Sequence, residues 1–146
     1  MLKGLRQRAF DGFVELHVAT YRLTGGRIGS SFRGVRTLLL DHVGRKTGAK
    51  RTSPLLYIED GDDLVIVASK GGSRRHPAWW LNLRDSPRTT VQVGGDRREV
   101  IARQANADER ARLWPRLVEV WPDYERYQRR TERRIPVAVL EPRSPG

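Results

Sequence analysis

The chain has 146 residues, the size of one compact domain, and 38% of them are hydrophobic. It contains no cysteine, which excludes disulfides and thiolate metal sites, and no apolar run reaches the ~20 residues that span a bilayer. The net charge is +11, and 24 of the 28 basic residues are arginine. This favours an anionic partner such as nucleic acid, anionic lipid or a phosphorylated cofactor, although a solvated surface explains many of these arginines equally well.

The first part of the chain predicts a helix followed by a strand hairpin. Apolar side chains recur at a helical period over residues 3–23, at Leu5, Ala9, Phe13 and Leu16. Gly25 and Gly26 would end this helix. Apolar and β-branched residues then predict strands over 35–43 and 52–59, joined by the polar, glycine-bounded loop 44–51.

The rest of the chain alternates short strands and helices. A turn over 60–63 leads to a strand over 64–69, and Pro77 opens a helix over 78–85. Strands 89–93 and 97–104 predict a second hairpin. Asn106 and Glu109 have the spacing of a capping box and start the next helix, which Pro115 should kink or split. A further helix follows Pro122, and the last element is a strand over 135–142.

These elements predict a mainly β protein of the α+β class. About six strands joined mostly by hairpins favour an antiparallel sheet closed into a small barrel, with helices packed outside it. The order is not that of repeated strand–helix–strand units. We expect residues 1–34 to form an N-terminal helix and loop, residues 35–142 the barrel domain, and residues 143–146 a tail.

Three stretches carry chemistry. In "GRKTGAKR" glycines free the backbone while cations and a hydroxyl offer donors to phosphate or carboxylate groups, although a solvated hairpin tip fits as well. In "SKGGSRRHPAWWLNL" the strand end Ser69–Lys70 precedes two glycines, and Trp79 and Asn82 share a helix face that suits a flat, polar-edged ring. Core packing of both tryptophans is the alternative, and Trp80 belongs to the core in either case.

The third stretch is a helix with Tyr124 and Tyr127 on one face, where a phenol can orient a carbonyl or donate a proton; packing against the sheet is the alternative. The three histidines show no metal-ligand spacing, so no metal is predicted. A chain without metal sites or cysteine that catalyses a reaction would most naturally use an organic cofactor.

Three blocks, in this order and spacing, resemble the deazaflavin-dependent nitroreductase family of actinobacteria. They are "GRKTGAKRTSPL", "DLVIVASKGGSRRHPAWWLNL" and "ERARLWPRLVEVWPDYERYQRRTERRIPVAVLEP", and the resemblance covers about residues 35–142. It implies a split β-barrel related to flavin reductases, and coenzyme F420, an 8-hydroxy-5-deazaflavin with a phosphate and a polyglutamate tail, as cofactor. FMN is the second choice.

The resemblance also implies roles for individual residues. Ser69 and Tyr124 would be catalytic, with Tyr124, Ser69 or water supplying a proton. Leu56 and Trp121 stand where a nitroimidazole-reducing member of the family has tyrosines, so this sequence does not predict nitroimidazole reduction. The acceptor would contact Leu56, Trp121, Tyr124 and Tyr127. The cofactor would contact Arg45, Lys46, Thr47, Arg51, Thr52, Ser53, Pro54, Val67, Ala68, Ser69, Lys70, Ala78, Trp79 and Asn82.

The implied activity is a quinone, nitro or enone reductase that transfers a hydride from the reduced deazaflavin to an electrophilic small molecule. One alternative is an F420- or flavin-binding protein with little turnover. Another is a basic nucleic-acid-binding module, but no recognition helix or aromatic–basic platform supports specific nucleic-acid binding. We expect a cytoplasmic protein, and the basic N-terminal helix offers contact with an anionic membrane surface as a further option. The oligomeric state is not predicted.

Overall fold

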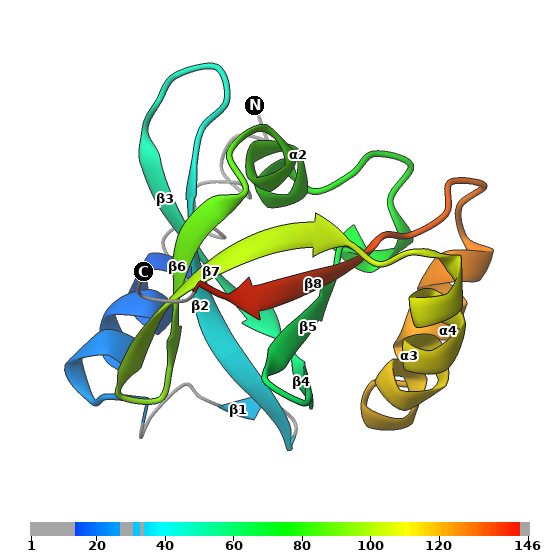
Figure 1. Cartoon of the computed structure of the whole chain (residues 1–146), viewed down its shortest axis with the longest axis horizontal. Coiled ribbons are helices and arrows are strands. Elements are labelled where there is room, and N and C mark those ends of the chain that lie inside the picture. Colours follow the sequence, from blue (N-terminus) through cyan, green and yellow to red (C-terminus); the bar gives the residue numbers. More distant parts are fainter. Residues whose placement is uncertain (1–13, 27–30, 33, 144–146) are drawn as a thin grey trace, which may run out of the picture.

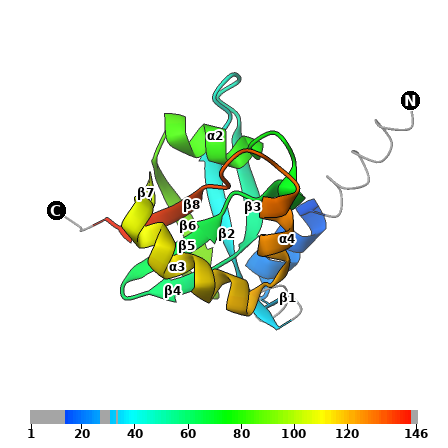
Figure 2. The same ribbon diagram turned by 90° about the vertical axis from the view of Figure 1, so that its right-hand side faces the viewer.

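The computed structural model describes residues 14–26, 31, 32 and 34–143, and its centre is one curled antiparallel sheet with helices around it (Figure 1). Residues 14–23 are helical and precede the first strand. The strands are β1 (Ser31–Phe32), β2 (Val35–Val43), β3 (Lys50–Leu56), β4 (Ile58–Asp60), β5 (Asp63–Val67), β6 (Arg88–Val93), β7 (Asp96–Gln104) and β8 (Val137–Pro142); the helices are α2 (Ala78–Asp85), α3 (Ala107–Val120) and α4 (Asp123–Arg129). Helix α2 lies beside the hairpin β2–β3, and α3 and α4 pack together elsewhere against the sheet (Figure 2).

The strand order is β1-β2-β6-β7-β8-β5-β4, and β3 pairs with β2 outside this path. All pairs are antiparallel. The predicted antiparallel barrel of the α+β class is thus confirmed. The predicted hairpins are confirmed too, the first with a shorter loop because β3 begins at Lys50.

The single strand predicted over 52–59 is wrong, because the chain changes partner strand at Tyr57. Before Tyr57, β3 pairs with β2; after it, β4 pairs with β5. The Tyr57 side chain is buried, and its backbone N–H donates to the Arg36 carbonyl over 3.1 Å. This corner and the two-residue β1 give eight strands rather than about six among the described residues, since elements of two or three residues leave little pattern in a sequence.

The sheet separates two apolar clusters, as the alternation of side chains along a strand requires. On β5, Leu64 and Ile66 join the cluster inside the curl, whereas Val65 and Val67 face α3 and α4. The β8 strand divides its residues in the same way. The inner cluster also takes Trp79, Trp80 and Leu83 from α2, which packs α2 onto the barrel.

Helix α3 starts at the predicted capping box but does not split at Pro115. The side chains and backbones of Asn106 and Glu109 exchange hydrogen bonds of 2.9 and 3.0 Å. Pro115 removes one helical bond, that of the Ala111 carbonyl, and both residues are exposed. Water can therefore satisfy that carbonyl, and the helix continues to Val120.

The first helix is described only over residues 14–23, so the prediction for residues 3–13 lies outside the described residues. The expected apolar stripe is wrong at Leu16, which is 66% exposed. The helix is held instead by Tyr21, whose buried hydroxyl lies 3.1 and 3.3 Å from the carbonyls of Thr37 and Gln92 and accepts from Gly94 N–H over 2.8 Å. The division into domains stays a prediction.

Candidate functional site

The hairpin β2–β3 carries the predicted cationic loop at its tip, and Figure 1 shows this hairpin extending from the sheet beside α2. The tip is closed by its own backbone: Gly44 N–H donates to the Ala49 carbonyl over 2.8 Å. Thr47 Oγ1 accepts from Ala49 N–H over 3.2 Å, so this hydroxyl takes part in the turn itself. Within the described part of the chain, no ion pair forms at the exposed cations of the tip, which are Arg45, Lys46, Lys50 and Arg51.

A buried polar chain connects this tip to α2. The backbone N–H of Arg45 donates to Asn82 Oδ1 over 3.0 Å, and Asn82 Nδ2 lies 3.0 Å from His42 Nδ1. His42 Nε2 lies 2.9 Å from Ser53 Oγ. Asn82 and His42 are 3% and 6% exposed. A backbone N–H can only donate, so Asn82 must present Nδ2 to His42, and His42 must accept at Nδ1 and donate from Nε2.

The hydrogen bonding requires a neutral His42, and its surroundings favour that form. Burial lowers the pKa of His42, and the positive charge of Arg51 lowers it further, while Asp41 acts weakly in the opposite direction. Arg51 is the register partner of His42 across the hairpin.

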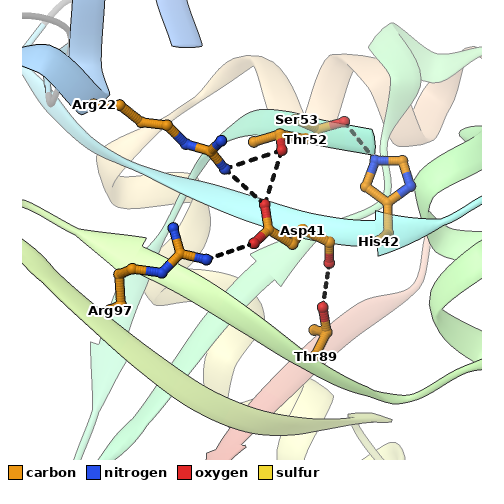
Figure 3. A network of polar contacts seen from close by, with 7 residues as sticks. All are labelled: Arg22, Asp41, His42, Thr52, Ser53, Thr89 and Arg97. Carbon is orange, nitrogen blue, oxygen red and sulfur yellow. Dashed lines mark hydrogen bonds and ion pairs between the residues drawn. The ribbon is translucent and has the colours of Figure 1, made fainter. Parts of the chain in front are cut away.

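The preceding residue, Asp41, takes part in a different network, which Figure 3 shows. Its side chain lies on the other face of β2 from His42, because successive side chains of a strand alternate between the two faces. Its carboxylate accepts from Arg22 at 2.9 Å, from Arg97 at 3.1 Å and from Thr52 Oγ1 at 2.8 Å. The Thr89 hydroxyl donates to the Asp41 carbonyl. Thr52 therefore contacts the network that joins helix 14–23 to the sheet, whereas Ser53 contacts the chain that leads to α2.

The loop after β5 is held mainly by the guanidinium of Arg133, and Arg130 Nη1 adds a hydrogen bond of 3.4 Å to the Gly71 carbonyl. Arg133 Nε donates to the Ser73 carbonyl over 2.8 Å, and Nη2 donates to the Ser69 carbonyl over 2.8 Å. Both Nη atoms lie 3.2 Å from the Ala68 carbonyl, and Nη1 lies 3.1 Å from His76 Nδ1. One planar fork thus fixes the backbone on both sides of the glycine pair.

The conformation of this loop suits an acceptor oxygen or anion. Ser69 is right-handed (φ −80°, ψ −40°) and Lys70 is left-handed (φ 44°). Successive residues of opposite hand turn their backbone N–H groups toward one point, which forms a concave donor site. Lys70 is exposed and adds a positive charge at the same place.

The same loop packs against α4. A Cβ on Gly72 would lie 2.6 Å from the Tyr127 carbonyl oxygen, so only glycine allows this contact. Tyr127 forms an edge-to-face pair with Tyr124, with ring centroids 6.2 Å apart. Tyr124 is 5% exposed, and burial, aided by Tyr127, raises its pKa, so the phenol stays protonated at neutral pH.

Comparison with known proteins identifies the family. A family model described as F420H(2)-dependent quinone reductase matches residues 13–142. The chain belongs to this family. The predicted resemblance is thus confirmed, as are the predictions that the protein is an enzyme and that its cofactor is coenzyme F420.

Individual relatives agree with this membership. An F420H(2)-dependent quinone reductase of Mycobacterium tuberculosis is 45% identical over 131 residues, which are 87% of this chain and 88% of the relative. A structure described as an F420-H2 dependent reductase is 38% identical, with a TM-score of 0.66, and the match covers 72% of this chain and 93% of that one. A structure described as a domain-swapped dimer is 31% identical, with a TM-score of 0.69, over 96% and 98% of the two chains.

The family's cofactor has an anionic tail and a flat ring with polar edges, and the described residues offer hydrogen-bond donors and cations for its anionic and polar groups. The tip offers unpaired cations, and the loop at Ser69 and Lys70 offers converging N–H donors. The ring walls are less open than predicted, since Trp79 is 8% exposed and packs with Trp80 in the inner cluster. The contact between Trp79 and the cofactor stays a prediction.

The other predicted site residues lie at several places in the fold. Val67 and Ala68 have buried side chains, so their backbone is the part that can contact a ligand; Ala78 is exposed at the start of α2. Pro54 and Leu56 are partly buried on β3. Trp121 caps α3 and packs against the cluster that contains Tyr124. Their roles stay predictions.

Two residues that hold the predicted site residues in place, His42 and Arg133, are not among those predicted. The sequence offers little signal for either, because His42 lacks metal-ligand spacing and Arg133 is one of 24 arginines. A groove of about 480 Å³ was also missed, because its walls come from β2, the Tyr57 corner and α3. Its lining includes Val35, Tyr57, Ile58, Arg116 and Val120.

Among the described helices, none is both long and apolar enough to cross a membrane. The predicted cytoplasmic location and the membrane contact of the N-terminal helix stay predictions.

Proposed function

We propose that this protein reduces a quinone with coenzyme F420, and that the acceptor reacts beside the loop Ser69–Gly72. When bound, reduced F420 supplies the hydride. The observation that supports this site is the contact between the loop and α4, which brings Ser69 and Lys70 next to the helix that carries Tyr124 and Tyr127. A quinone is favoured over nitro and enone compounds because the matching family model and a relative carry that activity in their names.

The chain's own residues have distinct tasks in this proposal. Arg45, Lys46 and Arg51 bind the phosphate and glutamates of the tail with charge-assisted hydrogen bonds. The backbone donors at Ser69 and Lys70, with the Lys70 ammonium, hold the polar edge of the ring. Arg133 keeps these donors in place.

Tyr124 serves as proton donor to the reduced acceptor. Burial raises the pKa of Tyr124, so the phenol carries its proton at neutral pH. The oxyanion that hydride addition leaves on the acceptor takes this proton, and water then returns a proton to Tyr124. Trp121 and Tyr127 exclude water from one side of the acceptor, since both pack on the cluster around Tyr124. Leu56 contributes an apolar contact from β3.

The test is direct. Purified protein is titrated with F420, FMN and FAD while cofactor fluorescence is followed, and oxidation of reduced F420 is then measured with menadione, a nitroimidazole and an enone. We expect the tightest binding for F420 and the fastest turnover with menadione. Failure to bind F420 would contradict the proposal, and binding without turnover of any acceptor would indicate a cofactor-binding protein instead.

A further inference from the structure

We infer that His42, acting through Asn82, positions the cationic tip of the hairpin to receive the anionic tail of the cofactor. His42 itself does not touch the cofactor; it determines where the tip lies relative to α2. The inference rests on the proposed function, because it assumes that the tail binds at the tip.

The hairpin needs such a link because the sheet does not support its outer half. Strand β6 pairs with β2 only at Leu39 and Leu40, whereas β3 pairs with β2 as far as Val43. Beyond Leu40 the hairpin is a two-stranded ribbon, which the Thr89 hydroxyl of β6 joins to the sheet at the Asp41 carbonyl. Such ribbons have little stability of their own. Its direction therefore depends on side-chain contacts with neighbouring elements.

Two sets of contacts hold the ribbon, one on each face. On one face, Asp41 binds Arg22 and Arg97, with exposed fractions of 30% for the Asp41 side chain and 40% and 55% for the arginines. On the other face, the hydrogen bonds through His42 and Asn82 are buried, and they end on the backbone of Arg45, the second residue of the tip. The buried set defines the position of the tip more closely, because water and salt weaken exposed ion pairs.

The order of donors and acceptors explains why this position holds a histidine. The link requires one group that accepts from Asn82 and donates to Ser53 from two atoms of a rigid ring. Neutral imidazole does both. Protonation would place two donors face to face at Nδ1 and would add a charge beside Arg51 and among the other tip cations. Among the described residues, Asp41 on the opposite face of β2 is the carboxylate that favours the protonated form.

A fixed tip matters for binding because its cations repel one another. No described carboxylate pairs with Arg45, Lys46, Lys50 or Arg51, so the free tip gains by spreading its charges apart. Holding the tip against α2 removes this freedom before the ligand arrives. The tail then binds more tightly, because the tip does not have to be ordered when the ligand binds.

The experiment compares two ligands and three variants. The ligands are F420 and the deazaflavin that lacks the phosphate and glutamates, and fluorescence titration gives both dissociation constants. His42→Phe keeps a ring but removes both hydrogen bonds, and His42→Asn keeps an acceptor toward Asn82. Tyr21→Phe is the matched control, because it removes buried hydrogen bonds at a place away from the tip.

We expect His42→Phe to weaken F420 binding about tenfold and to leave the tail-less ligand unchanged, with a raised KM for reduced F420 and an unchanged kcat. His42→Asn should recover part of this affinity. Tyr21→Phe should lower thermal stability without changing the ratio of the two constants. If His42→Phe does not fold, the smaller, tail-specific loss in His42→Asn decides.

Equal loss for both ligands in the His42 variants would overturn the inference, and so would no loss for either ligand in the folded variants. If the wild-type protein binds neither ligand, the proposed function fails. If it binds both equally, the tail does not bind at the tip, and the inference fails while the cofactor assignment stands.

Discussion

At the scale of single residues, burial sets the protonation state of the groups that carry the proposed chemistry. It raises the pKa of Tyr124 and lowers the pKa of His42, and both groups are therefore neutral at physiological pH. The two consequences differ. A neutral phenol can donate a proton, whereas a neutral imidazole can both accept and donate a hydrogen bond.

Tyr124→Phe should lower kcat about 100-fold and leave the F420 dissociation constant within about twofold, because phenylalanine keeps the ring packing and removes only the proton donor. Stopped-flow oxidation of reduced F420 by menadione measures the first quantity, and fluorescence titration the second. Tyr127→Phe serves as the control on the same helix. Weakened binding with normal turnover would instead make Tyr124 a cofactor contact.

Stability should decrease as the pH falls from about 7.5 to about 5.5. Burial lowers the pKa of both His42 and His76, with Arg133 and Arg84 adding to the effect at His76. The unfolded chain takes up these protons near pH 6.5 and the folded chain only at lower pH, so acid favours unfolding; the stabilisation is complete above pH 6.5.

Urea denaturation at the two pH values tests this dependence. The double variant His42→Asn, His76→Asn should show a smaller pH dependence than the wild type. An unchanged dependence in the double variant would assign the effect to other groups.

At the scale of elements, the short turn η1 (Lys70–Gly72) shows how one backbone position joins a loop to a helix. Gly71 and Gly72 both have positive φ, of 62° and 83°. A Cβ on Gly71 meets nothing within 4 Å, whereas one on Gly72 meets the Tyr127 backbone. The first glycine serves the turn alone, and the second also permits close packing against α4.

Gly72→Ala should therefore destabilise the fold by about 3 kcal/mol or more, because it combines left-handed backbone strain with a clash. Gly71→Ala introduces the strain without the clash and should destabilise the fold by about 1–2 kcal/mol. Chemical denaturation of both variants measures the difference. Equal losses would show that α4 moves aside at little cost. Gly72→Ala should also reduce turnover, because it separates Ser69 and Lys70 from the tyrosines.

At the scale of the whole molecule, the distribution of charge matters more than the net charge of +11. Arginines elsewhere bind carboxylates: Arg112 and Arg116 hold Asp60 at 2.8 and 3.0 Å, which joins α3 to β4. The tip cations of the hairpin have no such partner among the described residues. These cations are therefore available to bind an anionic ligand.

Binding of F420 should consequently weaken with added salt, since 1 M salt shortens the Debye length to about 3 Å. Arg51→Ala should weaken binding about fivefold at low salt and should reduce the salt dependence. Titrations at several salt concentrations, with Arg112→Ala as a control away from the tip, measure both effects. If neither added salt nor Arg51→Ala changes the affinity for F420, the tail binds elsewhere.

Local sequence patterns were sufficient to predict several of the helices and strands. Residues 78–85 form the predicted helix, the capping box of Asn106 starts α3, and strands 89–93 and 97–104 pair as a hairpin. The three motif blocks also determined the family and the cofactor. These features could be predicted because periodicity, capping and turn chemistry act between residues that are close in the chain.

The tertiary structure decided what depends on contacts between distant residues. Which surface each element buries explains three findings: the change of partner strand at Tyr57, the exposure of Leu16 and the continuity of α3 through Pro115. The links from His42 to Asn82 and from Arg133 to Ser69 span 40 and 64 positions. Such pairs cannot be predicted from local sequence, because the buried hydrogen bonds form only when the folded barrel brings the strands and helices together.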